Sequence, residues 1–332
     1  MKQILGILIS SIALLALASV AVSAQSQSAP QQGNGQALEI APPVLDIRGN
    51  PGETVEARIS LRDISPVRLL VRNEINDFVA AGEDGTPKIL VEEGEESPYS
   101  IKSWISPLPE ITLEPRQIEE LTVNIAIPAN AAPGGYFGVI RFTAEAPELS
   151  GTGVSLSASL GTLVLLRVNG DAKEAMSVEE FYVEKDQNRS WVFESAPIMF
   201  YERLKNEGNV HEQPRGQISI KDMFGQKIAN LNVNLENRNV LPGSTRKFEQ
   251  PLDETVIGNR MLFGRYTADL EITYGSAENR QTMTSQLSFW VIPYKLIAGI
   301  LLGLVALFFI LRIAIKRYND RLLSQSRGRR RR

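Results

Sequence analysis

The chain of 332 residues contains no cysteine. Disulfide cross-links, a thiol nucleophile, a zinc–thiolate centre and a lipid anchor on cysteine are therefore excluded. A secreted protein meets the oxidising surroundings in which disulfides form, so without them its hydrophobic cores must supply the stability. Histidine is almost missing as well, because His211 is the only one. It has no cluster of catalytic or metal-binding residues to complete, and we expect it to lie on a loop of a second domain.

No set of catalytic residues stands elsewhere in the sequence. The segment Glu92–Ser97 crowds four glutamates, namely Glu92, Glu93, Glu95 and Glu96. Weak calcium binding and the carboxylate pair of a glycosidase are two functional interpretations, but the spaced Asp, Asn and Gly of a calcium loop are absent. We expect a solvated acidic loop. The sequence thus yields no catalytic, cofactor-binding or metal-binding residue, and we expect a protein that is not an enzyme, takes no cofactor and has no small-molecule substrate.

Tryptophan is scarce too, with three residues in the chain. Trp104 and Trp191 have flat faces of the kind that stack on sugars. Packing inside a domain is the more common role of a tryptophan, and we expect it for both residues.

The first residues read as a secretory signal. Residues 4–22 are apolar or small, follow Lys2 and lead into Val-Ser-Ala, with small residues at the −3 and −1 positions of a cleavage site. We therefore predict a signal peptide over 1–24. The next residues, 25–37, are rich in Gln, Ser, Gly and Pro and predict a flexible linker.

A second apolar run lies near the other end. Leu296–Ile315 has twenty residues and one charge, Arg312. A helix of that length spans about 30 Å, the thickness of the hydrocarbon core of a bilayer. Aromatic residues of the kind found at membrane interfaces flank the run, at Trp290, Tyr294 and Tyr318. We predict a transmembrane helix over 291–315 and a basic tail over 316–332.

Charge is distributed unevenly along the chain. Residues 312–332 carry nine basic side chains and one acidic one, whereas residues 3–311 carry 25 basic and 37 acidic ones. The positive-inside rule places the tail in the cytosol and the acidic body outside, as in a single-pass protein of the cell membrane. Beside a membrane span we expect anionic lipid headgroups, and not nucleic acid, to be the partners of the tail.

The body of the chain alternates apolar and polar residues with a period of two. The clearest runs are Thr54–Leu61, Leu121–Ile127, Leu231–Leu235 and Tyr266–Tyr274. Alternation with one polar face is typical of antiparallel sheets, and turns rich in Gly and Pro separate the runs. No long amphipathic helical pattern precedes the membrane span.

A proline turn, glycines and a strand headed by tyrosine occur at Ile127–Phe142 and, more loosely, at Arg260–Gly275. Immunoglobulin-like sandwiches place a tyrosine near the start of a late strand, where its hydroxyl binds upstream backbone. Tyr136 and Tyr266 are predicted to be such corner tyrosines, and the glycines before them permit a positive φ. A phosphate cradle is not expected, because no helix and no suitably placed lysine follow the glycines.

These signals predict an all-β fold class: two tandem immunoglobulin-like β-sandwich domains followed by a single transmembrane α-helix. About 270 residues outside the membrane are too many for one small core and suit two domains of ordinary size. We place the first domain at 38–170 and the second at 171–290.

Four short segments follow one another in the first domain. They are a tryptophan segment, a Leu-x-Pro turn, an alternating strand that ends in proline and a glycine-rich strand start, at Tyr99–Ile105, Leu113–Pro115, Thr122–Pro128 and Gly134–Phe142. In this order they resemble the WxL-interacting protein family of bacterial surface proteins, as does the order of signal peptide, two β-domains, membrane helix and basic tail. The second domain shows no close match to the family's usual second module. The resemblance implies contact with peptidoglycan and docking of WxL-type surface proteins.

Three functions fit these observations. The main hypothesis is a membrane-anchored bacterial cell-surface scaffold or adhesion protein, whose extracellular sandwiches bind cell-wall polymer, another surface protein or both. The alternative is a membrane-anchored assembly factor or chaperone for surface proteins, which lends a free sheet edge to an incoming strand. A third, less favoured hypothesis is a wall-polymer hydrolase that uses the acidic loop Glu92–Ser97.

Overall fold

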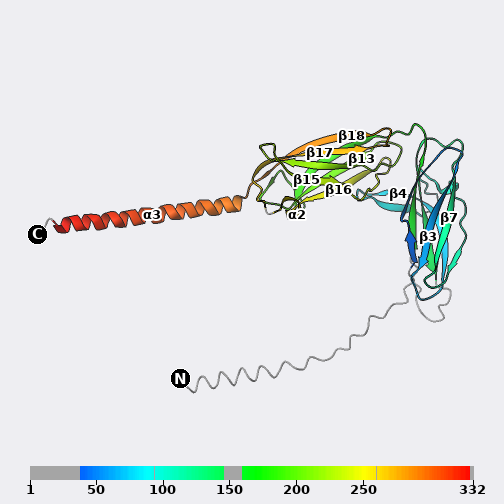
Figure 1. Cartoon of the computed structure of the whole chain (residues 1–332), viewed down its shortest axis with the longest axis horizontal. Helices are drawn as coiled ribbons and strands as arrows, with labels where there is room; N and C mark the ends of the chain where they lie inside the picture. The colour runs from blue at the N-terminus through cyan, green and yellow to red at the C-terminus, as the bar shows by residue number, and fades with distance from the viewer. Residues whose placement is uncertain (1–37, 93, 146–158, 259, 330–332) are drawn as a thin grey trace, which may run out of the picture.

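The computed structural model describes residues 38–92, 94–145, 159–258 and 260–329. Over these ranges the chain forms two β-sandwiches and one long helix that leaves the second sandwich (Figure 1). The predicted fold class of two β-sandwich domains and a carboxyl-terminal apolar helix is therefore confirmed. The predicted signal peptide and linker lie outside the described residues.

The first sandwich packs a three-stranded sheet against a six-stranded sheet. The smaller sheet has the order β1 (Leu38–Ala41), β3 (Thr54–Asp63) and β7 (Ile118–Ala126). The larger has the order β2 (Val44–Gly49), β9 (Ser159–Val168), β8 (Gly134–Glu145), β4 (Leu69–Ala81) and β5 (Thr86–Leu90), with β6 (Ile111–Leu113) beside β4. The 3-10 turn η1 (Lys102–Trp104) lies between β5 and β6. The predicted alternation of β3 is confirmed, because Ala57, Ile59 and Leu61 are buried and the residues between them are not.

The first two strands connect the two sheets. β1 pairs antiparallel with β3, and after Pro42 and Pro43 the chain continues as β2, which pairs in parallel with β9. Proline has no N–H to give to a ladder, so these residues suit the point where the chain changes sheet. β2 then forms the edge of the larger sheet, and no strand of the described residues pairs with its other side.

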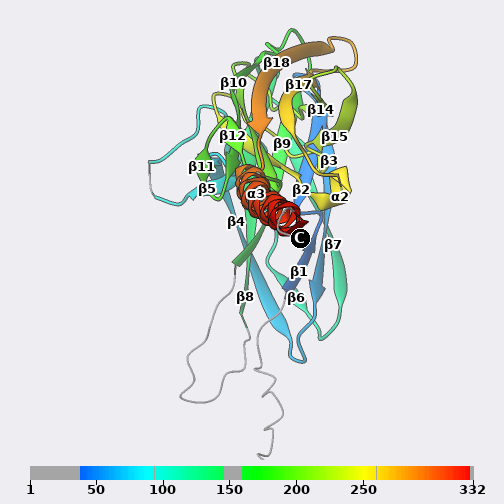
Figure 2. The ribbon, with the colours of Figure 1, turned by 90° about the vertical axis from the view of Figure 1, so that its left-hand side faces the viewer.

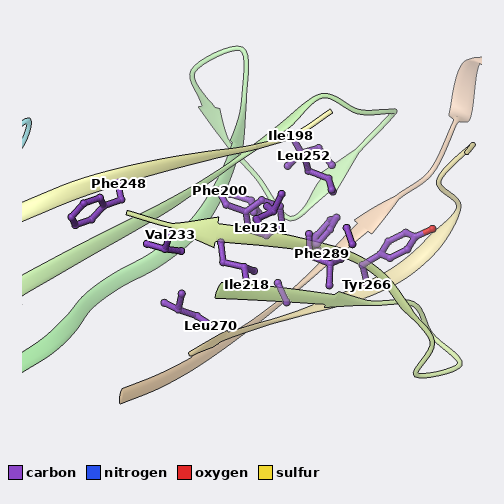
Figure 3. Packing of buried hydrophobic residues seen from close by; sticks show 14 of the residues in the cluster. Ile198, Phe200, Ile218, Leu231, Val233, Phe248, Leu252, Tyr266, Leu270 and Phe289 are labelled. Atoms are coloured by element: carbon purple, nitrogen blue, oxygen red, sulfur yellow. The ribbon is translucent and has the colours of Figure 1, made fainter. Parts of the chain in front are cut away.

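The second sandwich packs a four-stranded sheet against a five-stranded sheet. The first has the order β11 (Asn188–Arg189), β10 (Met176–Lys185), β13 (Ile198–Asn206) and β16 (Thr245–Leu252). The second has the order β12 (Val192–Phe193), β18 (Gln281–Val291), β17 (Gly264–Tyr274), β14 (Arg215–Lys221) and β15 (Lys227–Val233), and the short helix α2 (Glu254–Ile257) follows β16. Large apolar side chains from both sheets fill the core (Figure 3), among them Phe200, Leu231, Leu270 and Phe289.

Both predicted corner tyrosines bind upstream backbone. The hydroxyl of Tyr136 donates to the carbonyl oxygen of Ala132 at 3.1 Å, and that of Tyr266 donates to the carbonyl oxygen of Phe263 at 3.3 Å. Gly264 has a φ of 105°, which a residue with a side chain rarely adopts. The equivalence of the two tyrosine strands, predicted from sequence, is therefore confirmed.

The helix α3 (Tyr294–Arg329) follows β18 directly. It begins three residues later than predicted, because Val291 still pairs with Gly264 in the sheet. Within its segment Tyr294–Asn319, the most apolar stretch of 18 residues has a mean hydropathy of 2.7, and none of that stretch is buried. Such a helix is long and apolar enough to cross a bilayer, and it is consistent with a single membrane span.

Candidate functional site in the cleft between the sandwiches

The two sandwiches meet at a corner, so that the molecule is L-shaped (Figure 1). Asn209 joins the two sandwiches through three hydrogen bonds. Its backbone oxygen accepts from the N–H of Gly135 at 2.8 Å, and its side-chain amide donates to the carbonyl oxygen of Pro133 at 2.9 Å. Its side-chain oxygen accepts from the N–H of Lys173, on the connection between the sandwiches, at 2.8 Å. One residue thereby fixes both domains and their connection.

A second junction is made by the hairpin of β4 and β5, which extends from the first sandwich to the second. The guanidinium of Arg203 donates from Nε and Nη2 to the two carboxylate oxygens of Glu83, at 2.8 and 2.5 Å. The carbonyl oxygen of Glu83 accepts from the N–H of Lys247 at 2.7 Å. The hydrogen bond from Arg203 outweighs desolvation and lowers the pKa of Glu83, so the pair is ionised at neutral pH. Two junctions on different elements restrict movement between the domains.

Next to the Asn209 junction lies a polar cleft of about 520 Å³. Its walls are formed by β2 and β9 of the first sandwich and by the start of β14 and the end of β17 of the second. Four arginines from four separate segments line the cleft together with two acidic side chains: Arg48, Arg167, Arg215, Arg280, Asp46 and Glu212. Basic side chains outnumber acidic ones in this lining, which favours an anionic ligand over a cationic one.

Arg167 is fixed at this site by a buried carboxylate. Its guanidinium pairs with Glu174, whose side chain is only 1% exposed. Glu174 also accepts from the N–H of Ser276 at 3.2 Å and from the amide of Asn279 at 3.0 Å. Burial opposes its ionisation, but the hydrogen bonds from Arg167 and Ser276 outweigh burial and lower the pKa of Glu174. Arg167 is thus oriented before any ligand arrives.

Three further arginines are available to a ligand. Arg48 lies opposite Arg167 in the parallel register of β2 and β9, so both side chains leave the same face of the sheet. Arg48, Arg215 and Arg280 are exposed. Within the part of the chain that the structure describes, no hydrogen bond or ion pair joins their guanidinium groups to another residue.

His211 links the two sandwiches at the margin of the cleft. Its side chain is 6% exposed, and its Nε2 lies 3.2 Å from Oδ1 of Asp46 on β2. The hydrogen bond to His211 outweighs partial burial and lowers the pKa of Asp46. The histidine lies between β13 and β14, so the predicted loop of the second domain is confirmed, and from this loop the side chain also contacts the first domain.

Glu212 is buried beside these groups and has one unsatisfied oxygen. Its Oε2 accepts from the N–H of Gly275 at 2.9 Å, whereas Oε1 has no partner among the described residues. Burial raises the pKa of Glu212.

The unpaired edge of β2 runs from this cleft to a second, more apolar cavity. That cavity has a volume of about 440 Å³, and its apolar lining includes Val44 of β2, Phe78, Leu163, Leu165 and Leu241. Val44 and Arg48 are four residues apart, or about 13 Å along a strand. An apolar cavity, a free strand edge and an anion site therefore lie in one line.

The acidic loop takes no part in this arrangement. Glu92, Glu95 and Glu96 are exposed between β5 and η1, as expected for a solvated loop, and Glu93 lies outside the described residues. None of them lines the cleft. Among the described residues, no group of three or more His, Asp or Glu side chains has the arrangement to hold a metal ion.

Trp104 and Trp191 differ in how far they are buried. Trp104 packs beside the core of the first sandwich, with its ring centroid 4.3 Å from that of Tyr136, so the packing prediction is confirmed for it. The same prediction is wrong for Trp191, which is 77% exposed. β12 begins only at Val192 and buries Phe193, which leaves Trp191 beyond the end of the strand.

No sequence pattern points to the four arginines of the cleft. They are spread from residue 48 to residue 280, and each is an ordinary polar position of a strand or turn. Only the pairing of β2 with β9 and the packing of the two sandwiches bring them together.

No family model matches the chain, and no curated protein matches it. Solved structures are similar to it at low identity. The class 5 fimbriae chaperone CfaA is 12% identical, with 75% of this chain and 98% of that chain covered and a TM-score of 0.37. The Escherichia coli chaperone DraB is 12% identical (76% and 98% covered, TM-score 0.35), and a chain of the Salmonella enterica SafA pilin–SafB chaperone complex is 11% identical (76% and 97% covered, TM-score 0.35). Similarity at this level says nothing of what this chain binds, and the resemblance to the WxL-interacting proteins stays a prediction.

Proposed function

We propose that this chain is a membrane-anchored assembly factor that holds an extended segment of a secreted or surface protein between its two sandwiches. A carboxylate of that segment binds the arginines of the cleft. The observation that carries the proposal is the convergence of Arg48, Arg167, Arg215 and Arg280 beside the unpaired edge of β2.

The arginines favour a carboxylate ligand. A guanidinium presents parallel N–H donors that match the two oxygens of a carboxylate. Arg167 is already held by Glu174, so it loses little side-chain freedom when a ligand binds. Arg48 lies opposite it, and the two side chains together can grip one anion from the same face of the sheet.

The strand edge favours a polypeptide over a polysaccharide. β2 presents N–H and C=O groups with which an added strand forms a ladder, and a sugar polymer has no such main chain. A strand along β2 places an apolar side chain in the cavity beside Val44 and brings its end to Arg48. Both cavities are then used by one ligand.

The helix α3 supplies the anchor. With the nine basic residues of 312–332 on the cytosolic side, the chain holds both sandwiches outside the cell membrane, where secreted proteins emerge in an unfolded form. A surface scaffold, the other function considered, would use the same site but would keep its partner bound permanently. The resemblance to the WxL-interacting proteins adds peptidoglycan as a further partner of either function.

A binding measurement tests the site. The probe is a fluorescent ten-residue peptide of alternating valine and threonine, made with a free carboxylate or with a terminal amide, and the protein is the full chain in detergent micelles. A charged hydrogen bond contributes about 1.5–3 kcal/mol, so we expect the carboxylate form to bind at least about tenfold more tightly. Arg48→Glu should remove this preference.

Arg58→Glu is the matched control, because Arg58 is exposed on β3 and its side chain is 77% accessible. It should leave the preference unchanged. If the unaltered chain bound the carboxylate and the amide forms of the peptide equally tightly, the cleft would not recognise a carboxylate. In cells, loss of an assembly factor lowers the folded yield of surface proteins, whereas loss of a scaffold changes only where they are retained.

A further inference from the structure

Large apolar side chains are exposed at one end of the second sandwich. They belong to four separate parts of the chain: Trp191, Met223, Phe224, Met261, Phe263 and Trp290. Phe224 is 87% exposed and Met261 69%. Water-exposed aromatic and methionine side chains gathered at one place mark a contact surface. We call these six residues the apolar end.

The strand register shows that the six residues lie together. Val291 is opposite Gly264, and Trp290 is opposite Arg265, at the place where β18 ends and β17 begins. Val192 lies beside Trp290 in the parallel pairing of β12 with β18. The turn between β14 and β15 reaches the same place, because a Cβ on Gly264 would lie 1.8 Å from the Cε of Met223.

The helix α3 starts from this same end. Only Ile292 and Pro293 separate β18 from the helix, so the first residue of the helix cannot lie more than about 11 Å from the end of the strand. The N–H of Ile292 donates to the carbonyl oxygen of Phe193 at 2.8 Å, and Lys295 pairs with Glu194 at 2.6 Å. Figure 2 looks along α3 onto this end, with β12 and α2 on opposite sides of the helix. Whatever plane α3 enters therefore faces the apolar end.

We infer that the apolar end is a lipid-contacting surface that inserts into the interface of the outer leaflet around the start of α3. The inference rests on α3 being a membrane span, as the proposed function holds. Tryptophan and other large amphipathic or apolar side chains partition into the headgroup boundary of a bilayer. Asp253, Glu254 and Arg260 lie nearby, and Glu194 already pairs with Lys295, so charges of both signs surround the surface and the contact is apolar and not an attraction to anionic lipid.

Contact of the apolar end with lipid also sets the distance between the arginine cleft and the membrane surface. β17 runs from Gly264 at the apolar end to Tyr274 in the lining of the arginine cleft. Eleven residues of strand span about 35 Å. A second sandwich that rests on the membrane holds the arginine cleft at about that distance from the lipid surface, where an emerging polypeptide can reach it.

Tryptophan emission of the full chain in vesicles tests this inference. The double variant Trp104→Phe, Trp290→Phe leaves Trp191 as the only tryptophan, about one hundred residues before the helix. In zwitterionic phosphatidylcholine vesicles we expect the emission of Trp191 to be blue-shifted. We expect its intensity to be quenched when the lipid acyl chains carry bromine near the carbonyl group. This quenching should persist in high salt. The variant that keeps only Trp104, in the first sandwich, should show neither effect.

Two further variants separate the possible outcomes. Phe224→Asp combined with Met261→Asp should weaken the quenching of Trp191, whereas Leu235→Asp, at the other end of β15, should not. A Leu304→Trp reporter in α3, in a chain without other tryptophans, shows whether the helix is in lipid. Quenching at residue 304 without quenching at Trp191 overturns the inference and leaves the anchor intact. Quenching at neither position overturns the anchor and the inference together.

Discussion

Replacing Glu202 with glutamine should flatten the pH dependence of the stability of the second sandwich. Glu202 lies on β13 in the row of inward-facing side chains that includes Phe200 and Leu204. It is fully buried, and neither carboxylate oxygen has a hydrogen-bond partner among the described residues. Burial raises the pKa of Glu202 to about 8, because a charge is poorly solvated in this core.

The direction of the effect follows from the protons bound in each state. The unfolded chain has the ordinary carboxyl pKa of 4.5, so between pH 4.5 and 8 the folded form keeps a proton that the unfolded form has released. Stability then falls as the pH rises through this range, and it is fully present below pH 4.5. Since one pKa unit is worth about 1.4 kcal/mol, the loss over the range is about 3–5 kcal/mol. Glutamine does not titrate and should remove this loss.

Urea unfolding of the full chain in detergent measures the effect. In a Trp104→Phe background, tryptophan emission reports only the second sandwich, which holds Trp191 and Trp290. Between pH 5 and 8, the parent should lose about 3–5 kcal/mol more than its Glu202→Gln variant. Glu271→Gln, at an exposed position of β17, should behave like the parent. Parallel losses in the parent and in Glu202→Gln would refute the reasoning, because the carboxyl would then be solvated in the folded state.

Two further predictions concern the corner and the domain junction. Tyr266→Phe removes a hydroxyl that accepts from the N–H of Phe263 at 3.0 Å, and it should lower the stability of the second sandwich. We expect a loss of about 1 kcal/mol in the same urea assay, with Tyr182→Phe as a control on the opposite sheet; no loss would mean that the corner bond adds nothing. Arg203→Ala breaks the bidentate pair with Glu83 and should broaden the distribution of distances between the two sandwiches. The distances are measured between spin labels on one cysteine introduced into each sandwich, since the chain has no cysteine of its own. Arg189→Ala, which breaks a pair inside the second sandwich, is its control, and an unchanged distance distribution would show that the other junction contacts suffice.

Much of the fold was predictable because strands leave a period-two record in the sequence. The pattern of Tyr266–Tyr274 reappears as the buried and less buried faces of β17. The tyrosine corners were predictable for a similar reason, since the proline turn, the glycine and the tyrosine that make a corner lie within one short stretch of sequence. The short strand β12 was not, because two residues are too few to show a period, and the exposure of Trp191 went unrecognised with it.

The site was not predictable, because nothing local distinguishes its residues. Arg48 is an outward position of an edge strand, and Arg280 precedes β18 in a turn. Their common location depends on the parallel pairing of β2 with β9 and on the angle between the sandwiches. The ion pair of Glu83 with Arg203 joins residues 120 positions apart and leaves no trace in any window of sequence.

The two junctions between the sandwiches hold the arginine cleft in a fixed shape before a ligand binds. Like charges in one cleft repel each other, and around a single flexible hinge this repulsion would move the sandwiches apart. Asn209 on one side and the Glu83–Arg203 pair on the other oppose that movement. The guanidinium groups of Arg48, Arg215 and Arg280 are therefore kept in one cleft, where the carboxylate of Asp46 offsets part of their charge. An incoming carboxylate relieves the repulsion and meets donors that need no rearrangement, which favours its binding over that of water.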